Sequence, residues 1–244
     1  MALGEYFATI LLSILTRFLK GISTVKFTSI FSLVTLLIGA HAFASPSPQT
    51  LVYRANRADD LIQNLAGPAA PKDAAVPRAL LKASVCIVSI PGYKKAGFIF
   101  GGSYGAGVAA CRTQTGEFNA PFFVTLAGGS FGAQIGLKST DLLLVMTEED
   151  ARAELTKAQG IKLGVEASLA VGPLGRDLEA GTNIDFHEKT FSYSSSRGIF
   201  AGFSLNGSKL TYDSKAQNQV GSSDDVLAAM THFEVMINNL VSGL

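Results

Sequence analysis

Residues 97–145 read GFIFGGSYGAGVAACRTQTGEFNAPFFVTLAGGSFGAQIGLKSTDLLLV, and this stretch decides the fold class. Its aromatic and branched side chains alternate with glycine and other small residues more often than they recur at helical spacing. Such alternation is typical of strands, and glycines inside strands mark bulges or close backbone contacts. The stretch therefore predicts several strands, with bulges, in a mainly antiparallel sheet.

Two segments of this stretch share one pattern. Residues 101–106 and 128–133 both read G-G-S-aromatic-G-A. We interpret them as two strand-turn units with the same backbone requirements, in which glycine supplies positive φ or allows close backbone approach. A solenoid would need at least three copies of a repeat, and the sequence contains no third copy.

Helical patterns flank the strands. Residues 51–65 carry apolar side chains at helical spacing and are followed by Gly67-Pro68, which predicts an amphipathic helix that packs on the sheet. A shorter helix is predicted over residues 76–83, with a proline at its start. Near the C-terminus, residues 222–225 form a cap for a helix with a predicted apolar face of Val226, Leu227, Met230, Phe233, Ile237, Leu240 and Val241.

Shorter signals complete the prediction. Residues 85–90 are expected to form a buried strand that ends at Pro91-Gly92, and Thr147 to begin a helix that reaches Gln159. Further strands are predicted at 162–171 and 190–195, and a hairpin at Asn206-Gly207, between 199–205 and 208–212. The fold class is α+β: a mainly antiparallel sheet, sandwich or barrel-like, with amphipathic helices at the N- and C-terminal ends.

The first 44 residues have the pattern of an export signal. Lys20 and Lys26 precede an apolar run, and the run closes with the small residues of Ala42-Phe43-Ala44. We expect cleavage after Ala44, which leaves residues 45–244 as a single domain in the periplasm or cell envelope. Because the segment before Lys20 is also apolar, an uncleaved N-terminal membrane anchor is the alternative.

Charge excludes nucleic acid as an expected partner. The chain has 20 basic and 19 acidic residues, a net charge of +1, and removal of residues 1–44 changes it to −1. A near-neutral protein has no broad positive field to attract a polyphosphate backbone.

The two cysteines, Cys86 and Cys111, each lie in an apolar run. They are compatible with one disulfide in an oxidising compartment or with two buried free thiols, the simpler interpretation.

Catalytic and cofactor motifs are weak. Ser103 and Ser130 both satisfy G-x-S-x-G, the nucleophile elbow of serine hydrolases, but neither is followed by the helical pattern that an elbow requires. Only two histidines, His187 and His232, follow Ala44 as candidate bases. The glycines of residues 105–110 lack the strand–turn–helix context of a dinucleotide site. Hydrolysis is therefore the weakest alternative, and no catalytic residue, metal or cofactor is expected.

Several ordered blocks resemble the SYLF domain family. They lie between about residues 55 and 220 and read VPRALL (76–81), GYKKAGFIFGGSYG (92–105), PFFVTLAGGSFGAQIG (121–136), STD (139–141), AVGPLGR (170–176) and YSSSRGIFAG (193–202). The resemblance implies lipid binding, because eukaryotic members bind phosphoinositides and some also bind and bundle actin. Bacterial members are typically exported, and this chain has an export signal of that type, so we expect actin to be an unlikely partner.

The resemblance and the local charge together suggest a lipid contact. Eukaryotic members use an amphipathic N-terminal helix with basic residues, and the corresponding part of this chain contains Arg54, Arg57, Arg78, Lys82, Lys94 and Lys95. Ordinary solvated charges are an equally simple interpretation of these residues. Arg176 and Arg197 are left open between pairing with a carboxylate such as Asp141 and contact with a headgroup phosphate.

The sequence therefore favours a non-catalytic exported module that binds membrane phospholipid headgroups in the cell envelope. The alternative is a structural or protein-interaction module of the envelope, with an envelope protein as its partner.

Overall fold

One sheet organises the described part of the chain. The computed structural model describes residues 45–71, 75–97, 100–131, 136–164, 169–171, 190–194, 205 and 207–243. The strand order is β5-β8-β3-β2-β1-β4-β7-β6, and neighbouring strands are antiparallel except β6 and β7. The strands are β1 (Cys86–Gly97), β2 (Phe100–Arg112), β3 (Phe118–Phe131), β4 (Gly136–Met146), β5 (Ile161–Lys162), β6 (Leu169–Val171), β7 (Thr190–Ser194) and β8 (Lys209–Tyr212). The predicted α+β class is confirmed, and the predicted signal segment lies outside the described residues.

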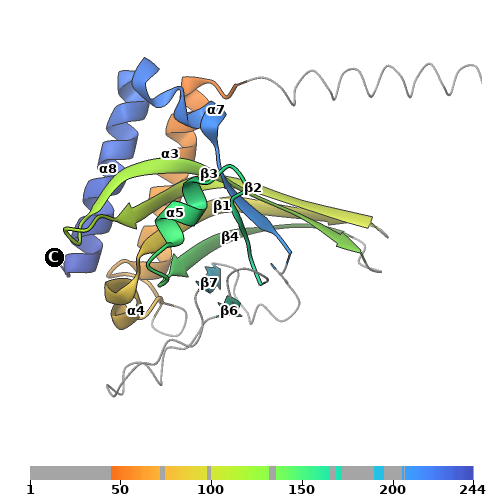
Figure 1. The fold of residues 1–244 in the computed structure, drawn as a ribbon, viewed down its shortest axis with the longest axis horizontal. Helices are drawn as coiled ribbons and strands as arrows, with labels where there is room; N and C mark the ends of the chain where they lie inside the picture. The colour runs from red at the N-terminus through yellow and green to blue at the C-terminus, as the bar shows by residue number, and fades with distance from the viewer. Residues whose placement is uncertain are drawn as a thin grey trace, which may run out of the picture. The chain divides into compact units, whose positions relative to one another are not determined.

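Two long helices lie on one face of the sheet (Figure 1). The helix α3 (Pro48–Ala66) begins at the N-cap Ser47, whose hydroxyl accepts a hydrogen bond from the Thr50 amide. The helix α8 (Asp224–Ser242) ends at Gly243, which has a φ of 85°. The shorter helices are α4 (Arg78–Ala83), α5 (Ala151–Thr156) and α7 (Ser214–Gln217), with a 3-10 turn, η1 (Val220–Ser222). Described residues from Pro46 onward belong to one compact unit.

Each face of the sheet is buried in its own apolar cluster. The first joins α3, α4 and α8 to the sheet, and all six apolar positions of the predicted N-terminal helix lie in it: Leu51, Ala55, Ala58, Leu61, Ile62 and Leu65. Burial of one such leucine or isoleucine contributes about 1.5–3 kcal/mol. The apolar face of α3 therefore packs on the sheet, as predicted. The second cluster lies on the opposite face and includes α5.

β1 does not end at Pro91-Gly92, where the sequence predicted its end. It continues to Gly97 by means of a bulge. Ser89 pairs with Val108 of β2, and the next pair is Lys94 with Tyr104, so a step of five residues along β1 lies opposite a step of four along β2. Gly92 has a φ of 63° in this bulge, and its amide donates a hydrogen bond to Asp141 Oδ1 at 2.7 Å. The extra residue is absorbed in the bulge, so the ladder continues beyond the proline.

The repeated glycine pattern also differs from its prediction. The first copy lies wholly within β2 rather than at a turn, and its residues 101–103 pair with residues 128–130 of the second. Residues 128–131 of the second copy lie in β3, and its last two residues lie outside the described residues. Glycine is required at Gly107, where an added Cβ would lie 1.9 Å from the Ser89 carbonyl oxygen. At Gly102 an added Cβ would meet nothing within 4 Å. Within the pattern itself, an added Cβ at Gly105 would lie 2.6 Å from Ile90 Cγ2 and 3.2 Å from the Cα of Tyr93, so close approach to β1 explains this glycine.

Cys86 and Cys111 are joined by a disulfide and lie directly opposite each other on β1 and β2. Both side chains are buried. The free-thiol interpretation of the sequence is therefore wrong. The apolar runs around the two cysteines indicated burial but gave no information on strand register, which brings them together.

Two predicted details of the helices are wrong as well. The helix after Thr147 is only Ala151–Thr156, with Asp150 at its N-cap position. On α8, Leu227 is 52% exposed and lies outside the apolar face. The hairpin predicted at Asn206-Gly207 lies mostly outside the described residues, which include only Leu205 of its first strand; in the described part of the chain, β8 pairs with β3 and β5.

Candidate functional site

The six basic residues proposed as lipid contacts do not form one surface. Arg54, on α3, forms an ion pair with Asp213, with 2.9 Å between Nη1 and Oδ2, and its guanidinium lies 5.4 Å from the centre of the Phe123 ring. Its side chain is only 13% exposed. Arg54 is therefore part of the attachment of α3 to the sheet.

Arg57 lies nearer the surface. Its Nη2 is 3.9 Å from Asp141 Oδ1, and its side chain is 42% exposed. Because the same carboxylate accepts the Gly92 amide, the Arg57–Asp141 pair connects α3 to the bulge of β1. Arg176 and Arg197, the other suggested partners of Asp141, lie outside the described residues.

The remaining four basic residues occupy two distant places. Arg78 and Lys82 are exposed on α4, which precedes β1. Lys94 and Lys95 lie near the far end of β1, and at about 3.3 Å per residue the eight residues from Cys86 to Lys94 span roughly 26 Å. Neighbouring strand residues point to opposite faces of a sheet, so Lys94 and Lys95 do not share a face. Lys94 is exposed and Lys95 is half-buried.

Lys94 belongs to a row of side chains that crosses five strands. The strand registers place Lys209 of β8, Ala127 of β3, Tyr104 of β2, Lys94 of β1 and Ser139 of β4 side by side. We call these five residues the distal row. Four of them are exposed, Tyr104 to 56%, and Lys209 is half-buried. The row therefore places an exposed aromatic ring directly beside one lysine and two strands from another.

The distal row lies on the helix-covered face, but beyond the helices. Val108 of β2 and its partner Phe123 are buried in the helix-side cluster. Two residues further out, Ala106 and Thr125 are half-buried, and the next pair is Tyr104 and Ala127. Burial thus decreases stepwise along the strands, whose ends run past α3 and α8 (Figure 1).

A second exposed tyrosine lies on α3. Tyr53 is 67% exposed and precedes Arg57 by four residues, so the two share one side of the helix. Sequence reasoning singled out Lys94 but missed Tyr53, Tyr104 and Lys209. The alternation of side chains along β2 and β8 indicates which residues of one strand share a face. It does not indicate which residues of different strands lie side by side, and that register is what forms the distal row.

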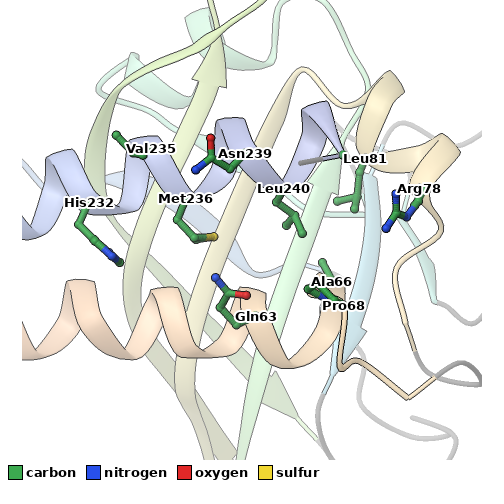
Figure 2. Close-up of a pocket in the computed structure, with 11 residues that line it drawn as sticks. Gln63, Ala66, Pro68, Arg78, Leu81, His232, Val235, Met236, Asn239 and Leu240 are labelled. Carbon is green, nitrogen blue, oxygen red and sulfur yellow. The ribbon is translucent and has the colours of Figure 1, made fainter.

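A groove separates the C-terminal halves of α3 and α8 at the end where α4 packs. We call it the interhelical groove; its volume is about 340 Å³, and its lining includes Gln63, Ala66, Leu81, Met236, Asn239 and Leu240. Figure 2 shows Met236 and Leu240 directed from α8 toward α3, and Gln63 directed from α3 toward α8. Arg78 lies at one end and His232 at the other.

The candidate nucleophiles are not in an elbow. Ser103 lies within β2, where its hydroxyl accepts a hydrogen bond from the Tyr93 hydroxyl at 2.8 Å and donates one to the Gly128 carbonyl at 3.1 Å. Ser130 lies within β3. A nucleophile elbow requires a sharp turn between a strand and a helix. Of the candidate bases, His187 lies outside the described residues and His232 lies on α8.

The ionisable pair between the long helices is Asp59 of α3 and His232 of α8, with 3.8 Å between Oδ1 and Nδ1. Burial raises the pKa of Asp59, His232 opposes that shift and Asp60 adds to it.

Within the described residues, no three histidine, cysteine or acidic side chains are placed to hold a metal ion. In the same part of the chain, each helix is too short or too polar to cross a bilayer.

The fold defines the class of domain. It is an α+β domain in which a curled, mainly antiparallel sheet packs against α3, which precedes the strands in the sequence, and α8, which follows them (Figure 1). Residues 127–231 match the family described as "Ysc84: Las17-binding protein actin regulator". The chain therefore carries a domain of the Ysc84, or SYLF, family.

Curated relatives agree with this assignment. LAS seventeen-binding protein 3 of Saccharomyces cerevisiae is 31% identical over 172 residues, 68% of this chain and 37% of that protein. SH3 domain-containing YSC84-like protein 1 of Xenopus laevis is 35% identical over 134 residues, 55% of this chain and 40% of that protein. An SH3 domain-containing protein of Schizosaccharomyces pombe is 41% identical over 118 residues, 48% of this chain and 27% of that protein.

The chain thus spans about a quarter to two fifths of the length of these relatives. The family is described as a regulator and its relatives as binding or SH3-containing proteins, which agrees with a non-catalytic module. The expectation that actin is an unlikely partner has no support from these comparisons, because the family description names actin regulation.

Proposed function

We propose that this chain is a non-catalytic, exported module of the cell envelope that binds anionic membrane lipid through the distal row. The observation that carries the proposal is the exposed Tyr104 beside Lys94, on a part of the sheet that none of the described helices covers. Tyrosine favours the membrane–water interface, and each lysine near an anionic surface contributes about 1 kcal/mol. The small neighbours Ala127 and Ser139 allow this surface to approach headgroups closely.

Local charge supports the proposal more than net charge does. The protein without residues 1–44 would carry a net charge of −1, but attraction to a membrane falls off within a Debye length, about 8 Å at physiological salt. Lys94 and Lys209 are three strands apart, roughly 14 Å at 4.8 Å per strand. The row therefore presents two positive charges to neighbouring headgroups.

Vesicle flotation tests the proposal. The protein without residues 1–44, which retains the compact unit from Pro46 onward, is mixed with vesicles of phosphatidylglycerol and phosphatidylcholine, or of phosphatidylcholine alone. We expect binding only to the anionic vesicles, and we expect K94E/K209E to weaken it at least tenfold, since two charges of about 1 kcal/mol are reversed. K82E is the matched control, because Lys82 is exposed on α4, outside the row, and its reversal should change binding much less. Equal binding to neutral vesicles would contradict the proposal.

Export is the second part of the proposal. The Cys86–Cys111 disulfide supports it, because such bonds persist in oxidising compartments. Mass spectrometry of the protein from fractionated cells should give an N-terminus at Ser45. A chain that retains residues 1–44 in the membrane fraction would favour the anchored alternative, and a cytosolic chain would contradict export.

The family description favours actin regulation as a second candidate function. Co-sedimentation of the full chain with filamentous actin would test it. Saturable binding to filaments would support the second candidate, and its absence would remove it.

A further inference from the structure

The interhelical groove lies apart from the distal row and has an apolar floor. Met236 and Leu240 are one turn apart on α8, and Leu81 of α4 lies beside them. Met236 is 7% exposed and Leu81 is 2% exposed. A surface with apolar side chains at this spacing matches the ridges of another helix, in which residues four apart also align.

The rim of the groove resembles that of a protein interface. Gln63 and Asn239 are exposed amides on α3 and α8, and Val235 is an apolar residue of the same lining that is 53% exposed. Specific interfaces commonly have an apolar centre within a polar rim. Val235 and Leu227 are the two large apolar residues of α8 with high exposure, and only Val235 lines the groove.

Arg78 supplies the positive charge of the groove lining. Arg78 is exposed at one end, His232 lies at the other, and no aspartate or glutamate of the described residues lines the groove. Asp59 of α3 faces His232, with 3.8 Å between Oδ1 and Nδ1, so a carboxylate already lies at that end. Arg78 sits at the C-terminal end of α8, where its Nη1 lies 3.6 Å from the position of a Cβ on Gly243. An acidic group of a partner would therefore be attracted to the Arg78 end.

The dimensions favour a helix as the occupant. The lining runs along α8 from His232 to the cap residue Gly243, a distance of eleven helical rises or roughly 16 Å, which is three turns. A volume of 340 Å³ is near the lower limit of small-molecule pockets, and most of its polar lining is exposed, so the groove is suited to a few side chains. We propose that the interhelical groove docks an amphipathic helix of a protein partner, with an acidic residue of that helix paired to Arg78.

Site-specific photo-crosslinking tests this docking site. The full chain is produced in its own cells with a benzophenone amino acid in place of Val235, and a second variant carries it in place of Leu227. Both side chains are exposed on the same helix, so neither replacement disturbs the apolar clusters. We expect Val235 to give a discrete protein adduct that Leu227 does not give. The crosslinked peptide, sequenced by mass spectrometry, should have apolar residues at positions i and i+4 and an acidic residue within one turn of them.

Charge reversal provides the second arm. R78E in the Val235 crosslinking variant should reduce the adduct at least fivefold, and reversal of the acidic residue in the identified partner should restore it. The proposal is overturned by an adduct with lipid, by the same adduct from both positions, by no adduct, or by an adduct that R78E leaves unchanged. Flotation of R78E on anionic vesicles separates this result from loss of lipid binding.

Discussion

At the scale of single residues, two arginines on α3 differ in a way that stability measurements can test. Replacement of Arg54 by leucine removes a 2.9 Å ion pair and a ring contact and leaves Asp213, 14% exposed, without this cation. We expect a loss of about 2 kcal/mol in the free energy of unfolding, between the values for surface and buried pairs. R57L is the control, because its pair is longer and more exposed, and it should cost less than about 1 kcal/mol. Urea unfolding followed by circular dichroism gives both values, and equal losses would contradict the assignment.

Asp59 should make stability depend on pH. Burial raises the pKa of this carboxyl in the folded protein, so the folded state holds the proton more tightly than the unfolded state. This contribution to stability is present below the unfolded pKa of about 3.9 and is lost as pH rises through the folded pKa. Among the described residues, Asp59 Oδ1 also has no hydrogen-bond partner.

Replacement of Asp59 by asparagine removes the ionisation. We expect D59N to melt at a higher temperature than the parent at pH 7.5, with the difference shrinking as pH falls through the raised pKa of the parent carboxyl. Melting curves across this range provide the test, and D60N, at an exposed neighbouring position, is the control. A lower melting temperature for D59N at pH 7.5 would show that its partner His232 outweighs desolvation.

At the scale of elements, two glycines of β2 form a matched pair. A Cβ at Gly107 would lie 1.9 Å from the carbonyl oxygen of Ser89, whose hydroxyl donates to the Ala58 carbonyl of α3. G107A should therefore separate β1 from β2 beneath the helix and cost more than about 3 kcal/mol, or prevent folding. G102A meets nothing within 4 Å and should stay within about 1 kcal/mol of the parent. Soluble yield and unfolding curves distinguish them, and equal behaviour would contradict the described packing.

The elements also show what sequence patterns can predict. The helix predicted over residues 51–65 is α3, because its apolar period, proline and glycine are all local signals. The continuation of β1 past Pro91-Gly92 was not predicted, because those residues usually end a strand, and the bulge depends on Asp141 of another strand. The distal row was mostly missed for the same reason: its residues meet only through the registers of five strands. Arg54 was proposed as a lipid contact, because its partner in the structure, Asp213, is distant in sequence and no local pattern indicates the pair.

At the scale of the whole molecule, the disulfide should contribute to global stability. Cys86 and Cys111 are separated by 25 residues, and closing such a loop in the unfolded chain contributes about 3 kcal/mol. Reductant should therefore lower the melting temperature of the parent protein. C86A/C111A should melt lower than the oxidised parent and show no further change with reductant. An unchanged melting temperature of the reduced parent would contradict this prediction.

The bulge of β1 has a consequence for the whole sheet face. Side chains alternate along a strand, so the one extra residue between Ser89 and Lys94 reverses which members of β1 point toward the helices. With it, Lys94 stands beside Tyr104; without it, Lys94 would point to the opposite face and a neighbour would take its place. A one-residue deletion at Gly92 would leave the composition of β1 almost unchanged, but it would exchange the side chains that β1 presents on each face of the sheet beyond the bulge. In this domain, the length of one strand segment, as well as its residue types, encodes what the surface presents.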